Sequence, residues 1–303
     1  MIMTGKSIPG DSKHGCLVIS FDTELAWGAI ETKRWVQRQA NGVYEHTRSV
    51  TRQLLEAFDS YEIPATFAIV GGMLEVPGKY SLDHLPEQAR DRTRRALRDG
   101  LPNSFCGHDM IDMIARSRIR HAIASHSYSH TRFLHPGVTP EFVREDLRHY
   151  WRVLPTELNA VPALVFPQND EGYYPEVRES GFRAIRGSDP EPDSRYRWQR
   201  MLKSVIGSPP LSEIVDVGGG LVRNTGSVPF ISGRRRRLLL VERQARLGLD
   251  RAVREGGTLH VWNHPFNFAE TPGLLSAFVR FLGIAATLRD QGRLVIGQME
   301  TGT

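Results

Sequence analysis

Residues 16–24 read Cys16-Leu-Val-Ile-Ser-Phe-Asp-Thr-Glu24, a continuous apolar run that stops at acidic residues. Such a run, without polar alternation, is typical of a strand buried on both faces, as in a parallel sheet. Similar runs recur along the chain, and the intervening segments show the spacing of amphipathic helices. The predicted strands are 16–21, 65–70, 121–124, 163–166, 182–185, 258–262 and 294–296. The predicted helices are 47–61, 84–100, 140–153, 238–254 and 273–289. This alternation predicts parallel βαβ units, arranged as a barrel or as an open doubly wound sheet.

The composition is that of a folded globular protein. Of its 303 residues, 40% are hydrophobic and 24% charged, which excludes a disordered, collagenous or coiled-coil chain. Two cysteines are too few for a disulfide framework and favour a reducing compartment.

The predicted organisation is a flexible N-terminal segment, residues 1–15, followed by one barrel domain over residues 16–303. The first segment is polar and lacks the apolar core of a secretory signal, and no stretch reaches the ~20 apolar residues of a membrane span. We therefore expect a cytoplasmic protein. Residues 186–236 are rich in Gly, Pro, Ser and Arg and are interpreted as a long excursion from the barrel.

A tight basic run occupies Arg234 to Arg237, within a net charge of +5. Such runs bind phosphate or nucleic acid in some proteins, but a solvated loop or helix start is the more common role. The remaining basic residues are spread along the chain, so no nucleic-acid partner is predicted.

Polar side chains follow four of the predicted strands. Asp22 and Glu24 end the first strand, and the segment from His126 to His130 follows another. Asn169 and His264 come after two more. Because functional residues of α/β folds gather at the carboxyl ends of strands, we expect these side chains to meet in one site.

His126 and His130 are spaced to reach a single metal ion, with a carboxylate from Asp22 or Glu24 completing a site that keeps positions open for water. Such an ion activates bound water and polarises a carbonyl. Asp22 and Glu24 face the same way in extended chain, so one can bind metal while the other takes a proton. His264 is a candidate general acid. The alternatives are a His-rich turn capping a strand, a capping Asp22 and a packed His264.

Aromatic and amide side chains near these strand ends are candidate sugar contacts. Trp27 and Trp262 could stack on sugar faces, although core packing is the commoner role of such residues. Asn169 and Asn267 could hydrogen-bond substrate hydroxyls, and the sequence does not choose between them.

The chain resembles the polysaccharide deacetylases of the NodB-homology group. The resemblance is carried, in order, by four segments: Leu17-Val-Ile-Ser-Phe-Asp22, Ile63-Pro-Ala-Thr-Phe67, Ile123-Ala-Ser-His-Ser-Tyr-Ser-His130 and Val261-Trp-Asn-His264. It implies a distorted (β/α)7 barrel and hydrolysis of an N-acetyl group on an amino sugar, in a polysaccharide or its precursor. It also implies one divalent metal ion, zinc first and cobalt or nickel as alternatives.

Carried over by this resemblance, His126 and His130 bind metal, Asp22 is the general base and His264 the general acid. The family has two adjacent aspartates where this chain has Asp22-Thr-Glu24, so Glu24 is interpreted as the third metal ligand, and the two carboxylates could exchange roles.

The chain departs from the family at its third motif, Arg-x-Pro-Tyr, which here reads Val165-Phe-Pro-Gln-Asn169. The arginine that steadies the base is missing, so another group must orient Asp22. Two further functions stay open: a metal-free amidohydrolase acting on a small cyclic amide, and a catalytically silent sugar-binding barrel.

Overall fold

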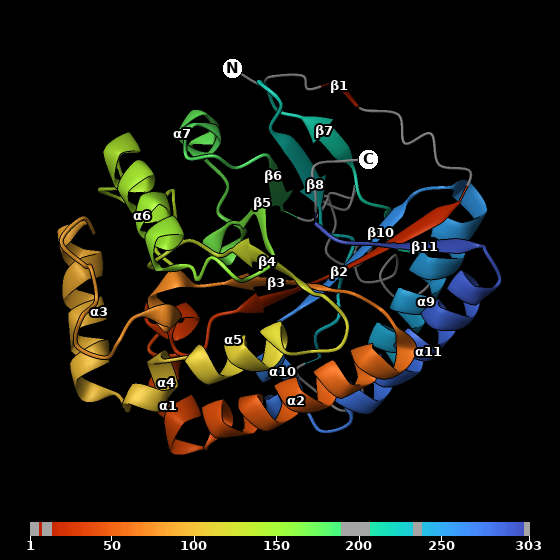
Figure 1. The fold of residues 1–303 in the computed structure, drawn as a ribbon, viewed down its shortest axis with the longest axis horizontal. Coiled ribbons are helices and arrows are strands. Elements are labelled where there is room, and N and C mark those ends of the chain that lie inside the picture. The colour runs from red at the N-terminus through yellow and green to blue at the C-terminus, as the bar shows by residue number, and fades with distance from the viewer. Residues whose placement is uncertain (1–5, 8–13, 189–206, 233–237, 300–303) are drawn as a thin grey trace.

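The computed structural model describes residues 6–7, 14–188, 207–232 and 238–299, in which an eleven-stranded sheet is flanked by helices (Figure 1). The strands run in the order β1-β7-β8-β6-β5-β4-β3-β2-β10-β9, and β11 also pairs with β2. Their bounds are β1 Lys6–Ser7, β2 Gly15–Thr23, β3 Thr66–Ile69, β4 Ala122–Ser125, β5 Ala160–Val165, β6 Ala184–Gly187, β7 Ile214–Asp216, β8 Val222–Thr225, β9 Val228–Pro229, β10 Thr258–Asn263 and β11 Leu294–Gly297.

The helices cover the outside of this sheet, with α2 along the lower edge in Figure 1 and α9 and α11 at one end. Their bounds are α1 Arg34–Ala40, α2 Val43–Tyr61, α3 Glu87–Asp99, α4 Pro102–Phe105, α5 His108–Ala115, α6 Pro140–Val153, α7 Tyr174–Glu179, α9 Leu238–Glu255, α10 Pro265–Glu270 and α11 Leu274–Asp290. Single 3₁₀ turns are η1 Trp27–Ala29, η2 Gly71–Leu74 and η3 Pro167–Asn169.

A continuous parallel run from β10 through β2, β3, β4, β5 and β6 to β8 forms most of the sheet. Phe21 near the end of β2 is in register with Phe67 of β3 and with Asn263, the last residue of β10. The carboxyl ends therefore lie along one edge, which brings together the residues that follow the strands.

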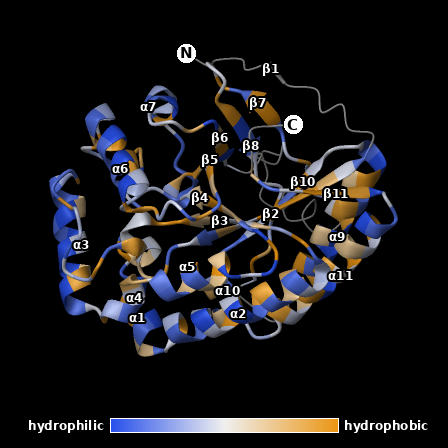
Figure 2. Ribbon diagram, viewed as in Figure 1, coloured by the Kyte–Doolittle hydropathy of each residue, from blue (hydrophilic) through white to orange (hydrophobic). Residues whose placement is uncertain are grey.

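The outer face of β2 is packed with aromatic side chains. Phe21 contacts Phe58 of α2 and Phe278 of α11, with ring centroids 5.8 and 5.9 Å apart. Figure 2 shows hydrophobic residues on the strands, on α9 and on α11, whereas α3 is largely hydrophilic. Burial of this face is the main force that holds the helices on the sheet.

The inner face of the sheet is built from small residues, among them Ala68, Ala124 and Ala184, all fully buried. Because side chains alternate along a strand, the polar residues Ser20 and Arg186 share this inner face with the alanines. The small side chains leave space in the middle of the barrel for the long side chain of Arg186.

The seven predicted strands and five predicted helices are all present, and the barrel class is confirmed. Residues 186–236 show no clear periodicity in the sequence, yet β7, β8 and β9 lie within residues 207–232. These strands are three, four and two residues long, too short to give a readable period in the sequence. The run from Arg234 to Arg237 and most of residues 1–15 lie outside the described residues. No helix in the described part of the chain is long and apolar enough to cross a membrane.

Candidate active site

A cleft of about 250 Å³ opens at the carboxyl ends of the strands. Seven of the nine residues singled out from the sequence line it: Asp22, Glu24, His126, His130, Asn169, Trp262 and His264. The other two, Trp27 and Asn267, are not among its lining residues.

Glu24 lies between the two histidines of the 126–130 loop. Its Oε2 is 2.9 Å from His130 Nε2 and 3.4 Å from His126 Nε2. One ligand atom from each of the three residues can be chosen so that all lie within 4.8 Å of one another, and all three residues are buried. Two imidazoles and one carboxylate are a donor set that suits a divalent transition metal.

The hydrogen bonds around this triad suit a metal as well. His126 Nδ1 donates to the Val165 carbonyl at 2.8 Å, so Nε2 is the nitrogen that faces Glu24. His130 Nε2 is buried and, despite its short distance to Glu24, has no hydrogen bond of acceptable geometry. A metal ion bound there would satisfy this imidazole nitrogen.

The charges within the triad are strongly coupled. Burial opposes ionisation of Glu24, but His130 and His264 outweigh it and hold the pKa of the carboxyl well below its ordinary value. Burial likewise lowers the pKa of His126, but hydrogen bonding to Glu24 and the charges of Asp22 and Glu24 raise it above the ordinary value. A cation between these groups would replace the imidazole proton.

The loop that carries the histidines is held in an unusual conformation by its own serines. Ser127 and His130 both adopt left-handed backbone angles, with φ of 61° and 58°. Ser125 Oγ accepts the Ser127 N–H, and Ser127 Oγ accepts the His130 N–H. These bonds offset the cost of two left-handed non-glycine residues and explain the first two serines of the Ser-His-Ser-Tyr-Ser-His sequence.

Asp146 of α6 supports the same loop from behind. Fully buried, it accepts the N–H groups of Tyr128 at 2.9 Å and Ser129 at 3.2 Å, and pairs with His84 Nε2 at 3.0 Å. Two orphan amides of the loop are thereby satisfied by one carboxylate.

Replacing Asp146 with alanine is expected to lower the free energy of unfolding by about 3 kcal/mol, because buried N–H groups lose their acceptor. Asp146→Asn, which keeps one oxygen, is expected to lose less. Urea unfolding measures both, and Asp109→Ala, which removes an exposed partner of Arg48, serves as the matched control. Equal stabilities of Asp146→Ala and the control would contradict this role.

Asp22 is clamped by Arg186, which projects from β6. The guanidinium NH1 and NH2 each lie 2.6 Å from one oxygen of the carboxylate, and Arg186 is only 1% exposed. NH1 also donates to Ser20 Oγ, and NH2 to Asn169 Oδ1, both at 3.2 Å. Burial raises the pKa of Asp22, but Arg186, with His126, outweighs it and holds that pKa at about 2. Arg186 therefore takes the place of the arginine missing from the third motif.

The hydrogen-bond network of Asp22, Arg186 and Ser20 extends to the buried histidine His260. His260 Nε2 lies 2.8 Å from Ser20 Oγ. Burial, together with the charge of Arg186, lowers the pKa of His260 to about 3. The imidazole is therefore neutral at physiological pH and adds no second cation beside the arginine.

His264 stands across the cleft from the carboxylates. Its Nε2 is 3.7 Å from Asp22 Oδ2 and 3.8 Å from Glu24 Oε1. Burial lowers the pKa of this imidazole despite the two carboxylates. Asn267, predicted to contact substrate, instead directs its amide at Asn263 and at the His264 ring.

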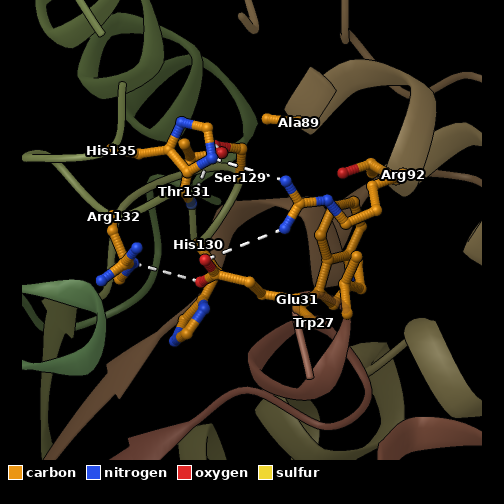
Figure 3. A pocket seen from close by; sticks show the side chains of 11 residues that line it. Trp27, Glu31, Ala89, Arg92, Ser129, His130, Thr131, Arg132 and His135 are labelled. Carbon is orange, nitrogen blue, oxygen red and sulfur yellow. Dashed lines mark hydrogen bonds and ion pairs between the residues drawn. The ribbon is translucent and has the colours of Figure 1, made fainter. Parts of the chain in front are cut away.

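Trp27, also predicted to contact substrate, is a core residue. It is 1% exposed, and its indole N–H donates to the Phe105 carbonyl at 3.0 Å. Its ring borders a small neighbouring cavity of about 30 Å³, in which the Glu31 carboxylate lies between two arginines, Arg92 and Arg132 (Figure 3). The indole fills core space beside the site, which is the commoner role of a tryptophan near a strand end.

Two residues that shape the site were missed from the sequence, although each left a signal. Arg186 directly follows the strand predicted at 182–185, at the kind of strand end where the other site residues were found. Asp146 shares the buried face of α6 with Phe142, Leu147 and Tyr150, so a carboxylate interrupts an apolar stripe. The cleft walls also contain Gly28, Ala29, Thr32, Arg34, Arg38, Gln168 and Phe266.

Comparison with known proteins bears on the family and the fold of the chain. The polysaccharide deacetylase family model matches residues 13–167, slightly more than half of the chain. No curated protein sequence matches.

Solved structures share the fold at low sequence identity. A Mycobacterium smegmatis protein assigned to the polysaccharide deacetylases superposes with a TM-score of 0.64 at 18% identity, over 99% of this chain and 92% of its own. A Pseudomonas aeruginosa PAO1 protein with the same assignment gives 0.52 at 13% identity, over 96% and 90%. The chain belongs to the polysaccharide deacetylase family, whose members are hydrolases of carbon–nitrogen bonds.

Proposed function

We propose that the chain is a metal-dependent N-deacetylase that acts on an acetamido sugar in a polysaccharide or in a precursor of one. The observation that supports this most is the arrangement of the cleft. A buried Glu24–His126–His130 triad lies beside a carboxylate clamped by arginine, and His264 faces both. Amide hydrolysis needs these three functions: polarisation of a carbonyl, activation of water and a donor toward the leaving nitrogen.

Each part of the reaction has a residue to perform it. Glu24, His126 and His130 would hold one divalent ion, zinc first, which when bound polarises the amide carbonyl and activates water. Asp22, ionised at neutral pH and fixed by Arg186, takes a proton from the attacking water. His264 donates from the opposite wall toward the reacting group.

The walls of the cleft offer contacts for a sugar. Trp262 lines the cleft, and Arg186 covers one face of its ring, with the guanidinium carbon 4.8 Å from the ring centroid. Asn169 lies between Arg186 and the cleft and keeps its amide N–H₂ for a hydroxyl of the substrate. Aromatic faces combined with amide donors are suited to carbohydrate rings.

Metal content is the first test. Protein purified without a metal-affinity tag is expected to contain close to one divalent ion per chain, and His126→Ala is expected to lose it, because one of three ligands is removed. Elemental analysis of both proteins measures this, with His135→Ala, outside the triad, as the matched control.

The same preparations are then assayed for acetate release from acetamido sugars. Activity that disappears with a chelator and returns with zinc, cobalt or nickel supports the proposal. Activity that survives chelation would instead favour a metal-free amidohydrolase, and an ion-free wild type that still binds sugar would favour a silent binding barrel.

Gly28 provides a second test of the triad. A Cβ atom at this position would overlap the Glu24 carboxyl group, and the backbone of Gly28 is not left-handed. Gly28→Ala is therefore expected to displace Glu24 and weaken metal affinity by about 10- to 100-fold. Equilibrium dialysis with zinc measures the affinity.

The compensating variant is Gly28→Ala with Glu24→Asp, in which the shorter side chain relieves the overlap. Its affinity is expected to exceed that of Gly28→Ala alone. An unchanged affinity in Gly28→Ala would show that Glu24 is not a ligand from its present position.

A further inference from the structure

Two asparagines surround His264, and the orientation of the first is set by backbone groups. Asn263 Nδ2 donates to the Phe230 carbonyl at 2.6 Å, and Asn263 Oδ1 accepts the N–H of His264 at 2.7 Å. A carbonyl can only accept and a backbone N–H can only donate. The two ends of the Asn263 amide are therefore unambiguous, and its oxygen faces α10.

The orientation of the second asparagine follows from the first. Asn267 Nδ2 lies 2.7 Å from Asn263 Oδ1 and 3.3 Å from His264 Nδ1. Because Asn263 presents an oxygen, Asn267 must present its NH₂ group, which has two hydrogens and accepts none. One hydrogen serves Asn263, and the other faces the imidazole, so His264 Nδ1 carries a lone pair.

We propose that Asn267, oriented by Asn263, is a positioning residue that holds His264 as the neutral tautomer with its proton on Nε2. That nitrogen faces Asp22 Oδ2 at 3.7 Å and Glu24 Oε1 at 3.8 Å. Protonating Nδ1 would set its N–H against the N–H of Asn267, two donors without an acceptor. His264 thus enters the reaction as a neutral hydrogen-bond donor, a role that imidazoles perform in other active sites.

This inference rests on the proposed deacetylase function and changes the path of the proton within it. Asp22 takes a proton from water as the oxygen bonds to the amide carbon. The same proton passes from Asp22 to the amide nitrogen as the carbon–nitrogen bond breaks. The products are a carboxylic acid and an amine, which exchange one more proton to give carboxylate and ammonium. His264 keeps its proton throughout, whereas the sequence predicted it to be the general acid.

The test is the position of the imidazole proton, read by NMR on protein labelled with ¹⁵N-histidine. His264→Gln identifies the two nitrogen resonances. In the wild type we expect Nε2 protonated and Nδ1 unprotonated. Asn267→Asp replaces the donor by an acceptor of the same shape, and the proton is expected to appear on Nδ1. Asn41→Asp, on an exposed residue, is the matched control and leaves the spectrum unchanged.

Kinetics provide the second measurement. Asn267→Asp and Asn267→Ala are expected to lower kcat by about 10- to 100-fold with KM within about twofold, because the donor is misplaced and the sugar contacts remain. A wild-type His264 with its proton on Nδ1, or a tautomer unmoved by Asn267→Asp, would overturn the inference. The spectrum needs no substrate, so a protein without deacetylase activity but with the expected tautomer refutes only the proposed function.

Discussion

Arg186→Met is expected to lower the free energy of unfolding by about 3–5 kcal/mol, because it leaves the Asp22 carboxylate buried and unpaired. The expectation rests on the two 2.6 Å contacts between the groups and on their near-complete burial. The same variant is expected to lose most of its activity, since the base is no longer fixed. Denaturant unfolding at neutral pH measures the stability.

The stability loss in Arg186→Met is expected to depend on pH in a direction that a nonspecific loss of packing would not produce. In the wild type the pKa of Asp22 is held at about 2, below its ordinary 3.8, so the pair contributes about 2 kcal/mol above pH 4 that is lost as pH falls toward 2. Without Arg186, burial raises that pKa, and the variant gains stability as the carboxyl protonates. The stability difference between the two proteins should therefore narrow as pH falls.

The double variant Arg186→Met with Asp22→Asn removes both charges and is expected to recover at least half of the lost stability. A double variant as unstable as Arg186→Met alone would show that packing, and not the unpaired charge, accounts for the loss.

The site was predictable where its residues follow strand ends, because parallel strands place their carboxyl ends on one edge. Asp22, His126 and His264 were found in this way, and the adjacent register of β2, β3, β4 and β10 explains why they meet. The alternation of apolar runs with amphipathic helices predicted parallel βαβ units in a barrel or an open sheet, and the family resemblance favoured the barrel.

The residues that orient the site were not predictable in this way. Arg186 directly follows a predicted strand, but it reaches Asp22 from 164 positions away in sequence, across an interior left open by alanines, and no local pattern encodes that pairing. Trp27 was predicted to face the cleft because it follows the first strand, but η1 turns its indole into the core. Position along the chain identifies the edge of the sheet, whereas the direction of a side chain depends on the loop conformation.

Substitution by the neutral amides can decide which carboxylate, Asp22 or Glu24, binds the metal and which acts as the general base. Both oxygens of Asp22 are engaged by Arg186, whereas Glu24 Oε2 faces the nitrogens of His126 and His130. Glu24→Gln is therefore expected to lose the metal. Asp22→Asn is expected to retain it while kcat falls by about 10²- to 10⁴-fold, the usual contribution of a general base.

Metal content and kcat are measured on both variants. Because Asp22→Asn leaves Arg186 unpaired, the measurements are made at a temperature where unfolding curves show each variant to be folded. The opposite pattern, metal lost from Asp22→Asn and retained in Glu24→Gln, would exchange the two roles. If each variant loses only the function expected of it, Arg186 keeps Asp22 from binding metal, and Asp22 stays available to the attacking water.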